Sequence, residues 1–437
     1  MAGEWPEVPL SDLTEPDTPV TYGVVKPGPE DPDGVLFIRG GDIADGRVLV
    51  ERLRTITRGV SEQYRRTQLR GGEIVVSLVG NPGQVAIVPA ALRGANIARQ
   101  AGLVRLRSDV DTRFVKYFLG SRFGQEALGA HSLGSVQQVI NLRDLKTVRV
   151  PVPPLFEQRA IAHILGTLDD KIELNGRMSE TLEAMARALF KSWFVDFDPV
   201  RAKAEGRDPG LPKHLADLFP SRLVDSELGE IPERWSAGGF GDLVDVLRDQ
   251  ERPFEFPSAV FRHHSLPAFD DGQWPRDEAG ADIKSLKFRV PEGAVLLSKL
   301  NPEIDRVWLV AVQPSDRAVC STEFVVLRPR QPAGRAFVYC LARSRAFRQG
   351  LEGLVTGTSK SHQRAQVGAI LSLPVPCPTN DLLQLFDRIA ESWLSRANAC
   401  RRESRNLASV RDTLLPKLVS GALRIDDAEA FMRRAGV

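Results

Sequence analysis

Cysteine is scarce in this chain of 437 residues, which has four cysteines, at positions 320, 340, 377 and 400. None of them forms a CxxC pair, so the sequence predicts neither a disulfide framework nor a zinc site. No window approaches the run of about 18 apolar residues that a membrane helix needs. The first residues, Met-Ala-Gly-Glu-Trp-Pro, lack the basic start and apolar stretch of a signal peptide. We therefore expect a cytoplasmic protein that does not enter a membrane.

Motifs of catalysis are also missing. An adenine methyltransferase would carry an Asn-Pro-Pro-aromatic or Asp-Pro-Pro-aromatic motif, but the chain has only Asn81-Pro82-Gly83 and Asn301-Pro302-Glu303, which favour hairpin turns. Residues 353–361 faintly resemble a phosphate-binding loop, yet Lys360 does not directly follow a second glycine as that loop requires. Asp169-Asp170-Lys171 imitates part of a nuclease site, but its helical spacing favours a solvated helix face. We expect no reaction from this chain alone.

Histidines offer no metal site either. His263, His264 and His362 have no cysteine or histidine at the spacing of metal ligands. We interpret them as surface or DNA-facing residues, and we expect the chain to bind no metal and no cofactor.

Net charge is only +2, but basic residues are unevenly placed. Residues 39–70 hold eight arginines against four acidic residues, and residues 335–364 hold six basic residues against one acid. Residues 157–183 are acidic, with six acids and three bases. Basic zones can attract DNA, although a solvated surface explains such charge equally well.

The strongest pattern is an internal duplication. Val150-Pro151-Val152-Pro153 precedes a long apolar-periodic helix, and Leu373-Pro374-Val375-Pro376 precedes another, 223 residues further along. Upstream, Gly134-Ser135 matches Gly357-Thr358 at the same offset. This period is far too long for a solenoid, whose units span roughly 20 to 50 residues. The sequence predicts a tandem repeat of a globular domain and a helix, which can approximate a two-fold axis within one chain.

Both globular halves are expected to mix strands and helices. In the first, Val35–Ile38, Ile74–Val79 and Val85–Val88 have the composition of strands, and residues 114–128 have helical spacing. The second half repeats this order, with expected strands at 295–298 and 307–310 and a helix at 336–351.

Two long helices are predicted from apolar residues at alternating steps of four and three. The first seam contains polar residues at Asn175 and Ser179, and the second at Arg396 and Glu403. Two such stripes in one chain are most simply buried against each other in an antiparallel coiled coil; each helix packing only on its own domain is the alternative. The residues expected in this coiled coil or in subunit docking are Ile161, Leu165, Leu168, Ile172, Leu182, Leu189, Trp193, Phe386, Ile389, Trp393, Leu407, Val410 and Leu414.

Four segments carry a resemblance to a known family. They are Pro153–Leu165, Leu174–Val200, Leu228–Trp235 and Asp412–Gly421. They resemble the conserved regions of the DNA-specificity subunit of type I restriction–modification systems, and with the duplicated layout the resemblance covers essentially the whole chain. Two departures are the second loop, Gly357-Thr-Ser-Lys-Ser-His-Gln363, which differs from the first, and a weaker match in the second helix before residue 405.

The resemblance implies an α+β architecture of two target-recognition domains held apart by the antiparallel helices. Each domain would read half of an asymmetric, interrupted site in double-stranded DNA. The helices would dock two methylation subunits, and restriction subunits would complete the nuclease. S-adenosylmethionine, ATP and magnesium would then be bound by those partners. The expected parts are domain 1 (1–152), spacer helix 1 (153–197), a linker (198–229), domain 2 (230–375), spacer helix 2 (376–425) and a tail (426–437).

Base recognition needs donors and acceptors such as arginine for guanine and asparagine or glutamine for adenine. Loops in corresponding places of both halves offer them, with the loops that follow Gly134 and Gly357 as first choice. The candidates are Arg65, Arg66, Gln68, Ser135, Gln137, Gln138 and Asn141 in the first domain, and Arg262, His263, His264, Ser359, Lys360, His362, Gln363 and Arg364 in the second.

Two other functions stay open at this point. A coiled-coil interaction scaffold without sequence-specific DNA binding would share the helices but give no role to the basic zones. Part of a fused methyltransferase-nuclease would need the catalytic motif that the sequence lacks.

Overall fold

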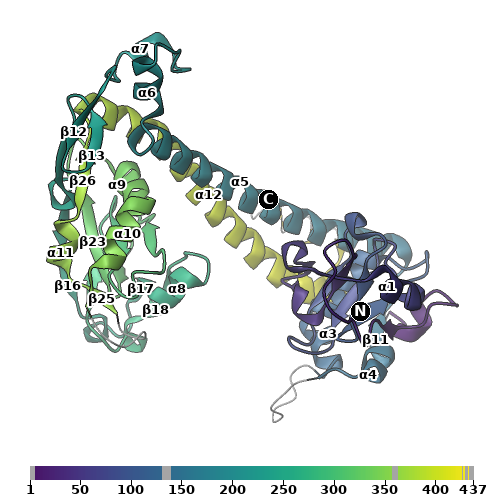
Figure 1. Cartoon of the computed structure of the whole chain (residues 1–437). Helices are drawn as coiled ribbons and strands as arrows, with labels where there is room; N and C mark the ends of the chain where they lie inside the picture. The colour runs from purple at the N-terminus through teal and green to yellow at the C-terminus, as the bar shows by residue number, and fades with distance from the viewer. Residues whose placement is uncertain (1–4, 130–138, 357–362, 426, 429–431, 433–437) are drawn as a thin grey trace. The chain divides into compact units, whose positions relative to one another are not determined.

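A computed structural model of the chain describes residues 5–129, 139–356, 363–425, 427–428 and 432. The chain divides into two compact units (Figure 1). The first unit comprises residues 1–174 and 403–437, and the second comprises residues 175–402. Each long helix therefore contributes one part to each unit. No helix of the described residues is both long and apolar enough to cross a bilayer.

A four-stranded antiparallel sheet forms the centre of the first unit, in the order β2-β10-β7-β8. Its strands are β2 (Thr21–Tyr22), β10 (Ala101–Val104), β7 (Ile74–Ser77) and β8 (Val85–Ile87). All four residues of β7 are buried. Ile74 belongs to one apolar cluster and its neighbour Val75 to another. The sheet thus has a core on both faces, which explains an uninterrupted apolar strand.

A smaller sheet in the order β6-β3-β9 stands beside it. In it β3 (Val35–Ile38) pairs antiparallel with β6 (Arg54–Ile56) and parallel with β9 (Asn96–Ile97). The start of the domain is joined to its end because β1 (Glu7–Pro9) pairs with β11 (Arg149–Pro151), directly before the first long helix. The first unit also contains β4 (Ile43–Ala44), β5 (Arg47–Val48), α1 (Arg58–Gln63) and α4 (Leu142–Thr147).

The helix expected over residues 114–128 is two helices, α2 (Thr112–Gly120) and α3 (Arg122–Ala127). Ser121 ends the first and caps the second, its hydroxyl accepting a bond from the Gly124 amide. A Cβ at Gly124 would lie 2.3 Å from the Phe118 carbonyl oxygen. The chain bends here because a serine cap and a close backbone approach interrupt an apolar pattern that itself continues.

The second unit repeats this topology. Its four-stranded sheet has the order β15-β23-β20-β21, and a second sheet again contains one parallel pair beside an antiparallel one, β22-β17-β18. The matching break between helices falls at Ser344, 223 residues after Ser121. The strands are β15 (Val244–Leu247), β23 (Phe324–Pro329), β20 (Val295–Ser298), β21 (Val307–Leu309), β16 (Gln250–Glu251), β19 (Lys287–Arg289), β22 (Ala318–Cys320), β17 (Val260–His264), β18 (Arg276–Ala279), β14 (Ser236–Gly239), β26 (Pro374–Cys377), β24 (Val355–Thr356) and β25 (Arg364–Ala365). Its short helices are α8 (Leu266–Asp270), α9 (Arg335–Ala342), α10 (Arg345–Gly353) and α11 (Val367–Leu371). The predicted fold class, two duplicated mixed domains with two long helices, is confirmed.

The segment expected to be a linker, residues 198–229, has regular secondary structure. It contains α6 (Asp198–Ala204), α7 (Lys213–Ala216) and a hairpin of β12 (Leu223–Ser226) and β13 (Gly229–Pro232). Phe219 of this segment packs edge-on against Trp193, with ring centroids 5.1 Å apart. The connector is therefore part of the core of the second unit.

The long helices are α5 (Leu155–Phe194) and α12 (Asn380–Val419), each of 40 residues. In the first unit Asp169 contacts Arg411 and Lys171 contacts Glu403. In the second unit Phe190 packs on Phe386, and Glu183 pairs with Arg401. In both units, residues further along α5 contact residues earlier in α12, so the two helices pair antiparallel.

The seam residues are placed as follows. Ile161, Leu165 and Leu168 are buried with Leu407 and Leu414 in the core of the first unit, where Ile172 and Val410 are partly buried. In the second unit Trp193 and Phe386 are buried, and Leu182, Leu189, Ile389 and Trp393 are partly buried. These side chains therefore make their contacts within the two units of the chain itself.

The polar layer of α5 is confirmed, because Asn175 and Ser179 are buried. The register expected in α12 is wrong at Arg396, which is exposed, while the neighbouring Ala397 is buried. Leu394, Ala397 and Cys400 form the buried stripe at that point, and their three-residue steps move the seam by one position.

Candidate nucleic-acid interface

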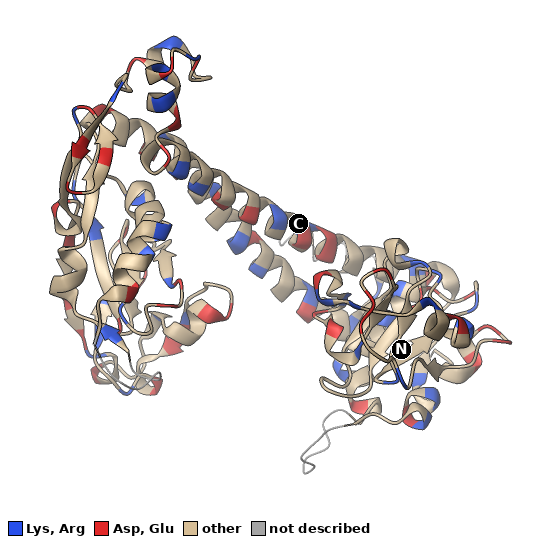
Figure 2. Cartoon of the chain, viewed as in Figure 1, with Lys and Arg blue, Asp and Glu red and all other residues tan. Residues whose placement is uncertain are grey.

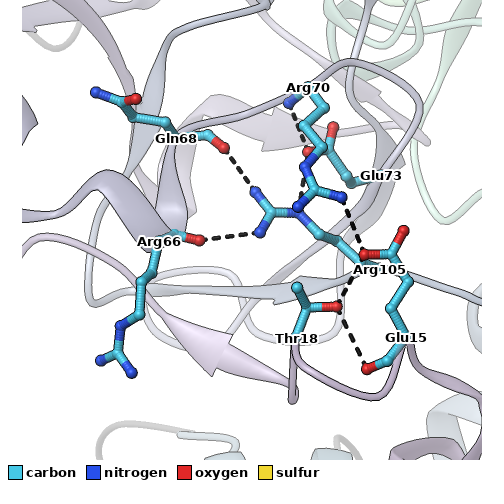
Figure 3. A network of polar contacts seen from close by, with 7 residues as sticks. All are labelled: Glu15, Thr18, Arg66, Gln68, Arg70, Glu73 and Arg105. Atoms are coloured by element: carbon cyan, nitrogen blue, oxygen red, sulfur yellow. Dashed lines mark hydrogen bonds and ion pairs between the residues drawn. The ribbon is translucent and has the colours of Figure 1, made fainter.

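The arginine-rich turn after α1 is held in place by one buried side chain. Arg65–Thr67 form a single turn of 3-10 helix, and Gln68 ends it. The guanidinium of Arg105 donates to the carbonyl oxygens of Arg66 at 2.9 Å and Gln68 at 2.6 Å (Figure 3). Since Arg105 is only 7% exposed, these bonds are shielded from water and fix the backbone of the turn.

Arg105 is itself paired with Glu73 across 3.3 Å, and both side chains are buried. The same carboxylate oxygen accepts a bond from the backbone N–H of Arg70 at 2.6 Å. The other oxygen of Glu73 is buried and has no hydrogen-bond partner in the described residues. A buried pair adds little net stability, but removing one partner leaves a buried charge. Its effect here is to tie both ends of the segment from Arg66 to Arg70 to one point.

The turn forms one wall of a cleft of about 330 Å³. The opposite wall is the segment around Thr18, and the two walls are linked because Arg70 pairs with Glu15 at 2.9 Å and the Thr18 hydroxyl donates to the same carboxylate oxygen at 3.1 Å. The cleft is lined by Asp17, Thr18, Pro19, Thr21, Arg65, Arg66, Gln68, Arg70, Leu103 and Arg105.

The three candidates on this wall, Arg65, Arg66 and Gln68, differ in which of their hydrogen-bonding groups are already used within the domain. Arg65 lies 3.5 Å from Glu62 in an exposed pair. The side chain of Arg66 runs away from the guanidinium of Arg105 in Figure 3. Gln68 uses its amide nitrogen inside the domain, donating to the Ser61 hydroxyl at 3.0 Å, so its donor is not available to a base.

The loop after Gly134 falls partly outside the described residues, including Ser135, Gln137 and Gln138. Beyond it, Val139 pairs with Val79, two residues after the end of β7. Asn141 is exposed at the start of α4, and its amide donates to Asp144 at 3.2 Å.

The second loop returns at the equivalent place. Ser359, Lys360 and His362 fall outside the described residues, and Arg364 pairs with Leu300, two residues after the end of β20. The guanidinium of Arg364 binds Glu323 at 2.8 Å. Gln363 is partly buried, and its carbonyl accepts the N–H of Asn301 at 2.8 Å.

The expectation that Arg262, His263 and His264 lie on an exposed loop is wrong. They form the end of β17, and Arg262 pairs with both Asp277 and Asp316. His264 is 1% exposed and packs edge-on against Trp308, with ring centroids 4.8 Å apart. Burial lowers the pKa of His264 to about 4, so its imidazole is neutral at pH 7. The polar triplet does not reveal a buried strand in the sequence, because Trp308, the aromatic partner of His264, lies far along the chain.

His263 is also largely buried, and its Nδ1 lies 3.1 Å from Glu278. Burial lowers the pKa of His263, although the nearby carboxylate opposes this shift. No group of three or more histidine, cysteine, aspartate or glutamate residues suited to a metal ion occurs within the described part of the chain.

The sequence also missed how the first domain is fastened to its helices. Asp169 is not on a solvated face. It accepts hydrogen bonds from the Tyr117 hydroxyl of α2 at 2.7 Å and from Arg411 of α12 at 2.8 Å, and Lys116 lies 3.5 Å away. Burial tends to raise the pKa of Asp169, but the bonds from Arg411 and Tyr117 hold it below its usual value.

The second unit has a comparable junction built from other residues. Tyr339 of α9 donates to Glu183 of α5 at 3.4 Å, and Arg401 of α12 pairs with the same carboxylate. In addition Asp387 of α12 accepts the backbone N–H of Phe337 at 3.0 Å and that of Gly334. Both domains are thus anchored to paired helices by a tyrosine, an acid and an arginine.

Figure 2 shows basic and acidic residues interspersed along both units. Part of the positive charge of the basic stretches is neutralised, because Arg39, Arg335, Arg343 and Arg364 each pair with an acidic residue. Composition alone therefore overstates the positive charge that these segments present.

Comparison with known proteins finds similar sequences and similar structures. Residues 4–184 match the family model described as the type I restriction modification DNA specificity domain. The type I restriction enzyme EcoBI specificity subunit of Escherichia coli is 34% identical over 159 residues, which are 36% of this chain and 33% of that protein. The matched part thus spans about a third of that relative. The HindI specificity subunit of Haemophilus influenzae is 24% identical over 342 residues, 65% of this chain and 71% of that protein.

Among solved structures, the S subunit of a type I restriction-modification system from M. genitalium is similar in fold. It superposes with a TM-score of 0.62 at 15% identity and covers 95% of this chain and 96% of that one. At this identity the likeness concerns the fold.

Proposed function

Because this chain belongs to the family of type I restriction–modification DNA specificity subunits, we propose that it directs such a complex to a two-part, asymmetric site in double-stranded DNA. The observation that carries this proposal is the repeated domain. The sheet orders β2-β10-β7-β8 and β15-β23-β20-β21 match strand for strand, whereas the side chains around them differ. Two copies of one fold with different surfaces suit two half-sites of different sequence.

Docking of partner subunits is assigned to the outer faces of the long helices. The buried seam is occupied by contacts within the chain, but α5 keeps large apolar side chains exposed. Phe156 is 70% exposed and Leu174 is 50% exposed. They lie 18 residues apart, about five helical turns, and therefore on one face of the helix. Large apolar side chains exposed to solvent in this way are typical of a protein interface.

The partners in this proposal are two methylation subunits and the restriction subunits, in the cytoplasm. S-adenosylmethionine, ATP and magnesium belong to those partners, and this chain supplies recognition without catalysis. The alternative scaffold without sequence-specific DNA binding would leave the cleft at Arg66 without a ligand.

The test is to map modified bases in DNA from cells that carry this chain and its methylation subunit. We expect methylated adenines within one motif whose two parts are separated by unread base pairs. Methylation without such a motif, or at a continuous motif, would contradict the proposal. A purified chain that transfers methyl groups alone would contradict the assignment of catalysis to its partners.

A further inference from the structure

We infer that Arg66 and Asp17 together read one G·C base pair of the first half-site, and that the buried Arg105–Glu73 pair is the device that positions Arg66. This inference rests on the proposed function and deepens it. Arg66 would donate to the O6 and N7 acceptors of guanine, and Asp17 would accept from the N4 amino group of the paired cytosine. These are the pairings that major-groove edges favour for the two residue types.

Arg66 is the arginine of the cleft whose charge is not used within the domain. Arg65 has Glu62, Arg70 has Glu15, and Arg105 has Glu73. The guanidinium of Arg66 forms no ion pair or hydrogen bond with any residue that the structure describes, and its side chain is exposed. The other three arginines of the cleft are paired with carboxylates. The solvated guanidinium of Arg66 is therefore the one that can exchange water for a ligand.

Asp17 is the matching acceptor on the opposite wall. It is exposed, lines the same cleft, and has no hydrogen-bonding or ionic partner among the described residues. Its backbone is held in a turn, because the N–H of Thr18 donates to the Glu15 carbonyl at 3.1 Å. Glu15 in turn pairs with Arg70, which lies on the same wall of the cleft as Arg66. The donor and the acceptor therefore stand on two walls that one ion pair holds together.

The acidic lining separates base reading from simple phosphate binding. A phosphate would be repelled by the carboxylate of Asp17, at a cost that grows as water is excluded. A base pair with one acceptor edge and one donor edge satisfies both side chains. Adenine offers a donor where guanine has O6, so an A·T pair in the same place would leave Arg66 with a poorer partner.

Positioning is the role of the buried pair. Base readout needs side chains held within about 0.5 Å of their productive geometry, which a loop rarely provides by itself. Here Arg105 donates to the carbonyl oxygens of Arg66 and Gln68, while the Glu73 carboxylate accepts the backbone N–H of Arg70 (Figure 3). Contact with a phosphate, which tolerates displacement, would not need this framework.

The experiment measures binding of the complete complex, with its methylation subunit, to duplexes that carry the mapped motif. Each base pair of the first half-site is changed in turn. For Arg66→Ala we expect the preference for G·C at one position to fall roughly 10- to 100-fold, with the second half-site unaffected. Arg66→Lys should lose most of this preference too, because lysine lacks the planar fork. Asp17→Ala should relax the same position. Arg54→Ala is the matched control, since Arg54 is an exposed arginine of β6 outside the cleft.

Arg105→Lys tests the positioning role, and a thermal melt shows whether that variant is folded. We expect relaxed preference at the position that Arg66 reads, with the salt dependence of binding unchanged. If Arg105→Lys does not fold, Glu15→Gln, which weakens only the exposed link between the walls, takes its place with the same expectation.

Two results would overturn the inference. One is that Arg66→Ala weakens DNA binding equally on all sequences and reduces the slope of log affinity against log salt concentration by about one, which is the signature of a phosphate contact. The other is an unchanged preference in Arg66→Ala. A wild-type complex with no sequence preference at all would instead overturn the proposed function, so the two failures can be told apart.

Discussion

Replacing Asp169 by alanine should destabilise the protein far more than replacing its neighbour Asp170. The Asp169 carboxylate is 26% exposed and accepts bonds from Tyr117 and Arg411, whereas Asp170 is exposed on the same helix. Loss of a hydrogen bond to a charged group costs about 1.5–3 kcal/mol, and partial exposure reduces this. Truncation also leaves the partly buried Tyr117 hydroxyl without its acceptor. We expect a loss of about 2–3 kcal/mol for Asp169→Ala and under about 0.5 kcal/mol for Asp170→Ala.

Urea unfolding of both variants, followed by circular dichroism, measures these values. A double-mutant cycle of Asp169→Ala with Arg411→Ala isolates the pair, and we expect a coupling above about 1 kcal/mol. The pH dependence gives an independent check. Because the pKa of Asp169 is held below its unfolded value, the carboxylate stabilises the fold above about pH 4, and this stabilisation is lost as pH falls through the lowered pKa. Asp169→Asn should weaken that acid sensitivity. Equal effects of the two alanine variants would refute the junction and restore the solvated-face interpretation.

Three further predictions concern the second unit, the helix break and the long helices. Burial raises the pKa of Asp387 to about 6, although its backbone N–H donors oppose this shift. The folded state therefore holds the proton more tightly than the unfolded state, and stability should decline as pH rises from about 4 to 6. Asp387→Asn should flatten that slope in pH-dependent urea titrations. Gly124→Ala should cost several kcal/mol because its Cβ would lie 2.3 Å from a carbonyl oxygen, whereas Gly120→Ala, with nothing within 4 Å, should be neutral or stabilising in thermal melts. Inserting seven residues into both α5 and α12 preserves the seam and should lengthen the unread gap without changing either half-site, as base mapping would reveal; an unchanged gap would count against the helices as a spacer.

The duplication and most strands could be predicted from sequence because they depend on local apolar runs. Ile74–Ser77 and Val295–Ser298 form strands as expected, since each is buried on both faces. The helix breaks at Ser121 and Ser344 were missed, because a single capping serine decides them within a continuing apolar pattern.

Contacts between residues distant in sequence limit how much of the candidate site could be predicted from the sequence. The carbonyl oxygens of Arg66 and Gln68 are held by Arg105, which lies 39 and 37 residues further along the chain. His264 is buried by Trp308, and Arg262 is neutralised by Asp316, 54 residues away. Residue types point to the turn at Arg65, Arg66 and Gln68 in the first domain, but which arginine remains unpaired is decided by tertiary contacts.

The most direct test of the account exchanges one domain. A hybrid chain in which residues 230–375 come from another specificity subunit should methylate, with its methylation partner, a site whose first half is unchanged and whose second half is new. A hybrid that alters both halves, or neither, would contradict the claim that each repeated domain reads its own half of the DNA site.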